Sequence, residues 1–205
     1  MTKRALVLVD IQNDFLPGGA LAVKDGDKIL PAINTLLGKP FDLVVATKDW
    51  HPHNHGSFAT VHHKKTGDIV DLHGLPQILW PPHCIQGTLG SEFGPGWDKS
   101  KIEMVFHKGI DKDIDSYSTF YDNGHRRTTG LDDCLKARGI KNIYIAGLTT
   151  EYCIKYSVLD AIELGFNVFV VEDGCRGVNL HAGDDARALK EMRKAGATIL
   201  QSSEV

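Results

Sequence analysis

The sequence lacks the features that mark membrane-spanning and exported proteins. It has no run of about 18 apolar residues, the length that a membrane-spanning helix needs. Only residues 1–4 precede the first apolar segment, and no apolar region of roughly 7 to 15 residues before a cleavage site is found there. We therefore expect a soluble protein of the cytoplasm that has no membrane partner.

Cysteine pairs and basic stripes are also missing. Cys84, Cys134, Cys153 and Cys175 are widely spaced and form no Cys-x-x-Cys pair, which argues against a disulfide framework and against a zinc ribbon. The net charge is −3, and the scattered basic residues could not neutralise a row of phosphates. We expect free thiols and no nucleic-acid partner.

The chain is long enough for one substantial core. With 205 residues, of which 42% are hydrophobic, it can bury about 70% of the surface that its unfolded form exposes. No internal repeat, low-complexity tract or linker interrupts it. A single domain spanning residues 1–205 is the expectation.

Apolar runs alternate with helical patterns along most of the chain. Residues 5–9 form a continuous apolar run that is typical of a strand buried on both faces. This alternation predicts an α/β fold, a three-layer α/β/α sandwich with a central six-stranded, mainly parallel sheet. The predicted strands cover residues 5–9, 41–47, 102–107, 143–147, 167–172 and 197–200, and the predicted helices cover residues 27–37, 129–138, 151–164 and 184–195.

Residues 49–100 break the alternation. Glycine, proline and histidine are frequent there, and seven of the ten histidines lie between positions 51 and 83. Irregular stretches of this length inside a compact domain are usually functional. We interpret the segment as an irregular insertion that binds a metal.

Three of the predicted strands lead to residues that can do chemistry, namely Asp10, Lys108 and Cys153. Ligands of parallel α/β sheets bind outside the carboxyl ends of the strands, so these side chains could share one crevice. The carboxylate could keep the amine charged, and the pair could take and return the proton of the thiol. The combination predicts nucleophilic catalysis.

The segment from Gly147 to Cys153 is a strand-to-helix turn in which Thr149 or Thr150 could cap the helix. The positive end of a helix dipole lowers the pKa of a nearby thiol, so we expect a lowered pKa for Cys153. The free backbone N–H groups of such a turn can stabilise an oxyanion. The alternative is a buried, inert cysteine.

Asp49 and His51 directly follow the predicted strand that ends at Thr47. Residues i and i+2 of an extended chain point the same way, so both side chains can face one metal ion. His83 could supply a third ligand, and such a set suits zinc, iron or manganese and leaves positions open to water or substrate. The alternative is a solvated loop with a chance Asp-x-His pair, a less specific signal than paired Cys-x-x-Cys motifs.

Six motifs follow one another in order along the chain. They are Asp10-Ile-Gln-Asn-Asp14-Phe15, Asp49-Trp-His51-Pro, Trp80-Pro-Pro-His83-Cys, Phe106-His-Lys108-Gly, Asp115-Ser-Tyr117-Ser and Gly147-Leu-Thr-Thr-Glu-Tyr-Cys153. From about residue 4 to about residue 180, this set closely resembles the nicotinamidases (pyrazinamidases) of the isochorismatase-like cysteine hydrolases.

The resemblance implies hydrolysis of nicotinamide, and also of pyrazinamide, through a cysteine thioester, with nicotinate and ammonia as the products of a step in NAD salvage. It implies one divalent metal ion, zinc before iron or manganese, that orients the substrate by binding its pyridine nitrogen. The implied roles are a triad of Asp10, Lys108 and Cys153, and metal ligands Asp49, His51 and His83.

The resemblance also implies the surroundings of the substrate. Phe15, Trp80 and Tyr117 would line the aromatic ring. A cis peptide bond before Thr149 would aim the backbone N–H groups of Thr149 and Cys153 at the carbonyl oxygen. A fourth metal ligand, such as His55 or Ser57, stays unassigned, and a homo-oligomer is allowed.

Three alternatives remain at this stage. Another amide or isochorismate-type hydrolase of the same superfamily would typically lack the metal ligands. A nucleotide-binding module would need a Gly-x-Gly-x-x-Gly turn after the first strand, where Asp10-Ile-Gln-Asn stands instead. A relative that binds metal without catalysis is the third.

Overall fold

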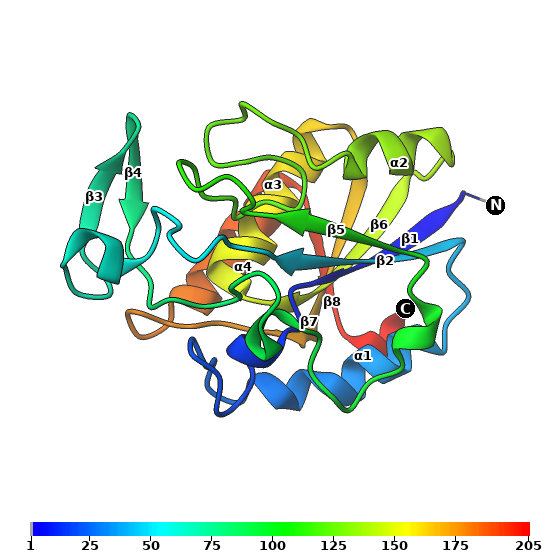
Figure 1. Cartoon of the computed structure of the whole chain (residues 1–205). Helices are drawn as coiled ribbons and strands as arrows, with labels where there is room; N and C mark the ends of the chain where they lie inside the picture. The colour runs from blue at the N-terminus through cyan, green and yellow to red at the C-terminus, as the bar shows by residue number, and fades with distance from the viewer. Residues whose placement is uncertain (1) are drawn as a thin grey trace.

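A twisted parallel sheet forms the centre of the protein, with helices on both sides of it (Figure 1). The computed structural model describes residues 2–205. The strands run in the order β5-β2-β1-β6-β7-β8, and every neighbouring pair is parallel. The six strands are β1 (Arg4–Val9), β2 (Leu43–Asp49), β5 (Met104–Lys108), β6 (Asn142–Leu148), β7 (Asn167–Arg176) and β8 (Thr198–Leu200). The predicted six-stranded sheet is confirmed.

Alternate residues of the central strands face two separate cores. Val7, Val45 and Ile145 pack with residues of three helices on one side, whereas Leu6 and Leu8 pack with residues of one helix on the other. These apolar runs form strands buried on both faces because helices cover the sheet twice. The first side carries α2 (Leu131–Ala137), α3 (Lys155–Glu163) and α4 (Asp184–Ala195), and the second carries α1 (Leu30–Leu37). The predicted three-layer sandwich is confirmed.

Local sequence explains several of the helix boundaries. Pro31 lies in the first turn of α1, where its missing N–H leaves no hydrogen bond unmade. Gly196 ends α4 with a φ of 118°, a conformation that suits glycine. The helix predicted from residue 151 begins instead with a single π-helical turn, Thr150–Ile154, before α3. Thr149 occupies the N-cap position of that turn without a capping side-chain hydrogen bond, so the predicted threonine cap is wrong.

A small hairpin within residues 49–100 was not predicted. The strands β3 (Ile69–Leu72) and β4 (Leu75–Ile78) pair antiparallel and stand apart from the main sheet in Figure 1. Their four-residue length and Pro76 within β4 left no clear alternating pattern in the sequence. Short 3₁₀ turns occupy residues 13–15, 26–29, 59–62, 89–91, 99–101 and 202–204.

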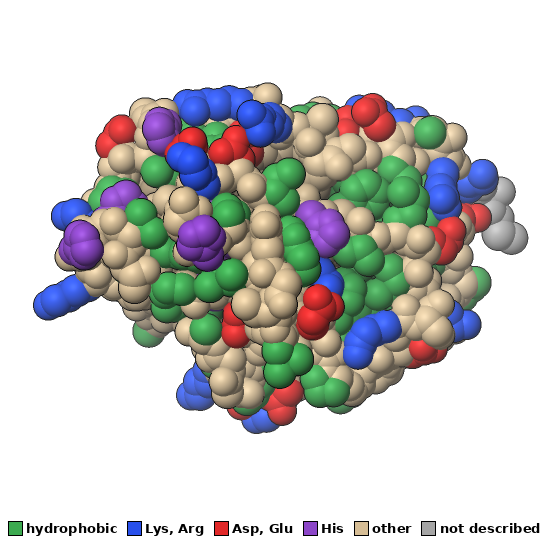
Figure 2. Space-filling view, viewed as in Figure 1, with side chains coloured by type: hydrophobic (Ala, Val, Ile, Leu, Met, Phe, Trp, Pro, Cys, Tyr) green, Lys and Arg blue, Asp and Glu red, His purple; other side chains and the backbone are tan. Residues whose placement is uncertain are grey.

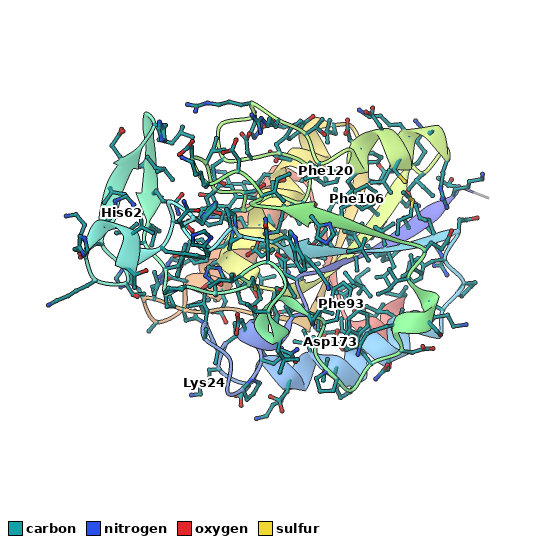
Figure 3. All side chains as sticks on the ribbon, viewed as in Figure 1. Lys24, His62, Phe93, Phe106, Phe120 and Asp173 are labelled. Carbon is teal, nitrogen blue, oxygen red and sulfur yellow. The ribbon has the colours of Figure 1, made fainter. Side chains whose placement is uncertain are left out.

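The helices, the surface and the core of the described chain add three observations. None of the helices within residues 2–205 combines the length and the hydropathy that crossing a membrane requires. On the face drawn in Figure 2, basic and acidic side chains are interspersed. Phe120, labelled in Figure 3, is fully buried and belongs to the core on the side of α2, α3 and α4.

Candidate active site and metal centre

The three residues predicted at strand ends lie together. Asp10 follows β1, Lys108 ends β5, and Cys153 lies in the π-helical turn after β6. The Nζ of Lys108 is 2.9 Å from Oδ2 of Asp10 and 3.4 Å from Sγ of Cys153. All three residues are buried. The sheet order explains this meeting, because β5, β2, β1 and β6 are consecutive and parallel, so their carboxyl ends lie along one edge.

Lys108 also joins the triad to the predicted metal ligands. Its ammonium group donates a hydrogen bond to the carbonyl oxygen of Ser116 at 3.0 Å and forms an ion pair with Asp49. Burial disfavours the charge, but the carboxylates of Asp10 and Asp49 outweigh this effect and raise the pKa of Lys108 well above its ordinary value. Lys108 is therefore a fixed positive charge in this site.

The acid and the thiol of the triad have proton affinities that differ from their ordinary ones. Burial raises the pKa of Asp10, although Lys108 acts against the shift. Burial also raises the pKa of the Cys153 thiol well above its ordinary value, and Asp10 and Asp49 add to the increase while Lys108 opposes it. The predicted lowering of the Cys153 pKa is therefore wrong, because loss of solvent outweighs the helix terminus. The thiol needs a base, and Asp10 can be one because a carboxylate oxygen of Asp10 lies within 4.8 Å of Sγ of Cys153.

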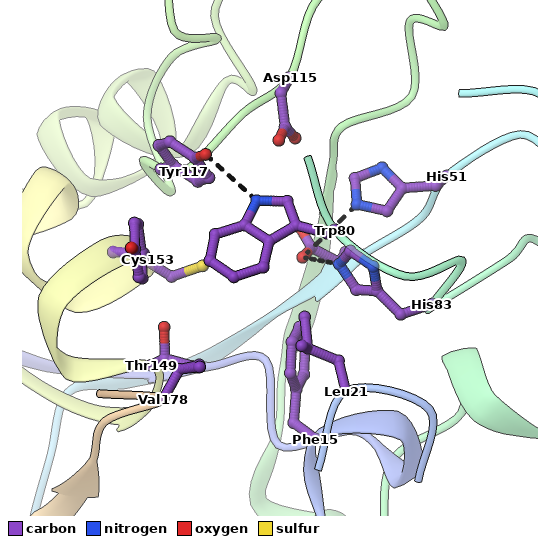
Figure 4. A pocket seen from close by; sticks show the side chains of 12 residues that line it. Phe15, Leu21, His51, Trp80, His83, Asp115, Tyr117, Thr149, Cys153 and Val178 are labelled. Atoms are coloured by element: carbon purple, nitrogen blue, oxygen red, sulfur yellow. Dashed lines mark hydrogen bonds and ion pairs between the residues drawn. The ribbon is translucent and has the colours of Figure 1, made fainter. Parts of the chain in front are cut away.

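The three predicted metal ligands converge on a single point. Oδ2 of Asp49 lies 3.6 Å from Nε2 of His51 and 3.7 Å from Nε2 of His83. One ligand atom from each of the three residues lies within 4.8 Å of the others, so together they could hold one metal ion. Figure 4 shows these contacts as dashed lines at one side of a pocket.

The histidine tautomers fit a metal at that point. Nδ1 of His51 donates to the carbonyl oxygen of Gly109 at 2.9 Å, and Nδ1 of His83 donates to that of Pro81 at 2.8 Å. When the rings are neutral, each Nε2 has its lone pair on the side of Asp49. Backbone carbonyls commonly orient metal-binding histidines in this way. The residues present fit a divalent cation.

His55 and Ser57 also lie beside the cluster and bond to each other. Nδ1 of His55 is 2.7 Å from Oγ of Ser57, and its ring lies 4.2 Å from that of His51. Burial and the neighbouring His51 lower the pKa of His55 to about 4. Nε2 of His55 is buried without a partner among residues 2–205. Neither residue belongs to the cluster of Asp49, His51 and His83, but His55 forms a second possible ion-binding cluster with His51 and Asp115.

A pocket connects the nucleophile with the metal ligands. It is lined by Cys153 and Thr149 at one side and by Asp49, His51 and His83 at the other (Figure 4). Twelve residues line this pocket, so it suits a small ligand.

The residues predicted to hold an aromatic ring all line this pocket. Nε1 of Trp80 donates to Oη of Tyr117 at 3.2 Å. The ring of Phe15 meets that of His83 edge-on, with 5.5 Å between centroids. Most of the wall is thus aromatic and apolar, and a few polar groups are placed at its ends.

The turn that carries the nucleophile has the predicted backbone. The peptide bond between Leu148 and Thr149 is cis, as the resemblance implied. The backbone of Thr149 acts to lower the pKa of Cys153, and Thr149 lines the pocket beside that thiol.

Four further residues line the pocket without having been assigned a role from the sequence. They are Leu21, Asp115, Tyr152 and Val178. Asp115 and Tyr152 lie inside motifs quoted above, which was a usable signal. Leu21 and Val178 are ordinary apolar residues in loops, and only the tertiary structure brings them to the site.

Comparison with known proteins gives a consistent result. A family model described as the Isochorismatase domain matches residues 4–204. Nicotinamidase of Escherichia coli is 48% identical over 202 residues, which cover 97% of this chain and 95% of that protein. Nicotinamidase/pyrazinamidase of Mycobacterium tuberculosis is 37% identical over 206 residues, covering 98% and 100%.

Solved structures of relatives have the same fold as this chain, and two of them are complexes with a ligand or a metal. Acinetobacter baumanii nicotinamidase has a TM-score of 0.95 and 43% identity, covering 100% of this chain and 98% of that one. A protein from L. infantum in complex with nicotinate has a TM-score of 0.86 and 35% identity, covering 98% and 94%. Pyrazinamidase of Pyrococcus horikoshii in complex with zinc has a TM-score of 0.77 and 36% identity, covering 97% and 99%. The chain belongs to the isochorismatase family.

Proposed function

We propose that this protein is a nicotinamidase that hydrolyses nicotinamide to nicotinate and ammonia and also accepts pyrazinamide. The observation that carries the proposal is the pocket, in which the Cys153 thiol lies opposite a set of metal ligands with aromatic side chains between them. The ammonium group of Lys108 contacts both this thiol and the buried carboxylate of Asp10. The relatives that are named nicotinamidases cover nearly the whole chain.

We assign the first half of the reaction to Cys153 and Asp10. Asp10 takes the thiol proton while the sulfur attacks the carboxamide carbon, and the carbonyl oxygen becomes an oxyanion facing the N–H groups of Thr149 and Cys153. The C–N bond then breaks, and Asp10 returns the proton to the departing nitrogen so that ammonia leaves. The acyl group remains on Cys153 as a thioester.

In the second half, water takes the place of the thiol as the nucleophile. Asp10 removes a proton from a water molecule while the oxygen of that water attacks the thioester carbon. The C–S bond breaks, the acid product leaves, and the proton passes to the sulfur, which restores the thiol. Throughout both halves Lys108 balances the negative charge that moves between the carboxylate and the sulfur.

Asp49, His51 and His83 would hold one divalent cation, with zinc as the first choice because a zinc complex of a relative has been solved. When bound, the cation would orient the substrate by coordinating the pyridine nitrogen. Phe15, Trp80 and Tyr117 would then fix the plane of the ring. We further propose a single domain that acts in the cytoplasm, and we leave open a homo-oligomer.

An ammonia-release assay on nicotinamide, with metal analysis of the same sample, tests this function. We expect ammonia and nicotinate in equal amounts, and we expect Cys153→Ala to release neither. Isochorismate and a ureido acid serve as competing substrates in parallel assays. Turnover of either one without turnover of nicotinamide would replace the proposal with the other hydrolase of the superfamily.

A further inference from the structure

Glu151 takes no part in the chemistry proposed above, although it lies two residues before Cys153 and only 5% of it is exposed. A buried carboxyl group is costly unless partners satisfy it. Oε1 accepts a hydrogen bond from the backbone N–H of Asn179. Oε2 is buried and has no partner within the described chain, residues 2–205. The free-energy cost of burying this oxygen suggests that Glu151 has a specific role.

Asn179 links this carboxyl group to α4. Its Oδ1 accepts a hydrogen bond from the backbone N–H of Asp185 at 3.0 Å, in the first turn of α4, where N–H groups have no helical partner. Asn179 has a φ of 53°, a left-handed conformation that asparagine adopts more readily than most residues. Residues 177–179 are therefore held from two sides, by the turn that carries the nucleophile and by α4.

The chain at Gly177 passes directly against the same carboxyl group. A Cβ atom at this position would lie 2.6 Å from Oε2 of Glu151 and 2.8 Å from Cβ of Asp185. Both distances are well below van der Waals contact. Glycine thus permits the close packing of residues 177–179 on Glu151.

Val178 lies between these two contacts and lines the substrate pocket together with Thr149 and Cys153. Figure 4 places it near Thr149, at the nucleophile's side of the pocket. Its apolar side chain forms part of that wall. Any change that frees residues 177–179 should loosen the wall.

We propose that Glu151 is a positioning residue that holds Val178 at the substrate pocket through its hydrogen bond to Asn179. This inference rests on the proposed function, because its kinetic test needs the substrate. Burial raises the pKa of Glu151, and Asp185 and Asp184 add to the effect. Glutamine keeps the length and an acceptor oxygen of this side chain, so it is the nearest neutral substitute.

Three variants test the positioning role by steady-state kinetics on nicotinamide. Glu151→Ala removes the acceptor, and Asn179→Gly removes the link to α4 while tolerating the left-handed backbone. Each should raise KM about tenfold or more and change kcat less than about threefold, because contacts made equally to the bound substrate and to the transition state affect KM alone. Glu151→Gln keeps the acceptor and should restore KM to within about threefold of the parent.

Asp173→Ala is the matched control. The Asp173 carboxylate (Figure 3) also joins two segments, since it accepts hydrogen bonds from the backbone N–H of Ser202 at 2.8 Å and from its hydroxyl at 2.6 Å. Asp173 does not line the pocket. Its loss should lower thermal stability and leave KM unchanged. If KM rises equally in this control, the rise of KM in Glu151→Ala is explained by general destabilisation, and the proposal is overturned.

Amide hydrogen exchange separates this proposal from the proposed function, because it needs no substrate. Glu151→Ala should speed exchange at Asn179 and its neighbours, and Asp173→Ala should not. If Glu151→Ala exchanges faster but the parent protein does not hydrolyse nicotinamide, the contact between Glu151 and Asn179 is supported and the proposed nicotinamidase activity is refuted. Unchanged exchange, or faster exchange with an unchanged KM, would refute the positioning role. Should Glu151→Ala fail to fold, Glu151→Met, which fills the space but has no acceptor oxygen, decides on the same two measurements.

Discussion

Gly109 gives a direct test of the metal centre, because its carbonyl oxygen accepts the Nδ1–H of His51 at 2.9 Å. A Cβ atom at Gly109 would lie 2.6 Å from that same Nδ1 and would also strike Cε1 of the ring. Ordinary contact needs about 3.5 Å, so in Gly109→Ala the ring must move by about 1 Å. Metal–ligand distances tolerate only about 0.2 Å.

The expected loss can be put into numbers. Disturbing the group that orients a metal-binding histidine typically weakens metal binding about 10- to 100-fold. The substitution also places alanine at a φ of 63°, which costs about 1 to 2 kcal/mol of stability by itself. The displacement of His51 must be separated from the backbone strain by a control variant that has only the backbone strain. Gly139→Ala is such a control, since Gly139 has a φ of 71° and its added Cβ would meet nothing within 4 Å.

The assay is metal retention against chelators of graded affinity, followed by elemental analysis, with circular dichroism to verify folding. Gly109→Ala should lose the ion to a chelator that the parent and Gly139→Ala resist. This readout does not depend on turnover, which matters because Gly109 follows Lys108. Equal retention in all three proteins would mean that His51 is not a ligand or is not oriented by Gly109.

Three further predictions concern the triad, the metal and a buried acid. Cys153→Ala should abolish ammonia release and leave metal content intact; residual activity within about tenfold of the parent would remove the covalent step. Asp49→Ala should deplete the metal and raise KM for nicotinamide, and full metal occupancy in this variant would contradict the assigned ligand set. Burial raises the pKa of Glu151 above its ordinary value of 4.5, so the folded protein holds that proton more tightly than the unfolded chain. The resulting stabilisation is complete below the unfolded pKa and is lost as the pH rises through the folded pKa. Urea unfolding from about pH 4.5 to about pH 7 should therefore show a smaller fall in the free energy of unfolding for Glu151→Gln than for the parent, and parallel curves would show that Glu151 does not titrate in this range.

The sequence by itself determined the sheet and the chemistry at its edge. Continuous apolar runs such as residues 5–9 can be stable only when covered on both faces, so a parallel sheet between helices followed from the pattern alone. Parallel strands present their carboxyl ends along one edge, which is why Asp10 and Lys108 could be expected near Cys153. Asp49 and His51 were readable for a similar reason, because i and i+2 share a face of a strand.

The tertiary structure alone decided the proton affinities and the outer wall of the pocket. The sign of the Cys153 pKa shift depends on how much solvent the folded chain removes, and burial outweighed the helix terminus that the local sequence suggested. The absence of a threonine side-chain cap and the hairpin of β3 and β4 likewise depended on backbone geometry that short segments do not specify. Val178 reached the pocket through contacts with Glu151 and α4 that join residues distant in the chain. Local patterns encode which residues can react, whereas solvent exclusion and long-range packing set how strongly they hold their protons and what encloses them.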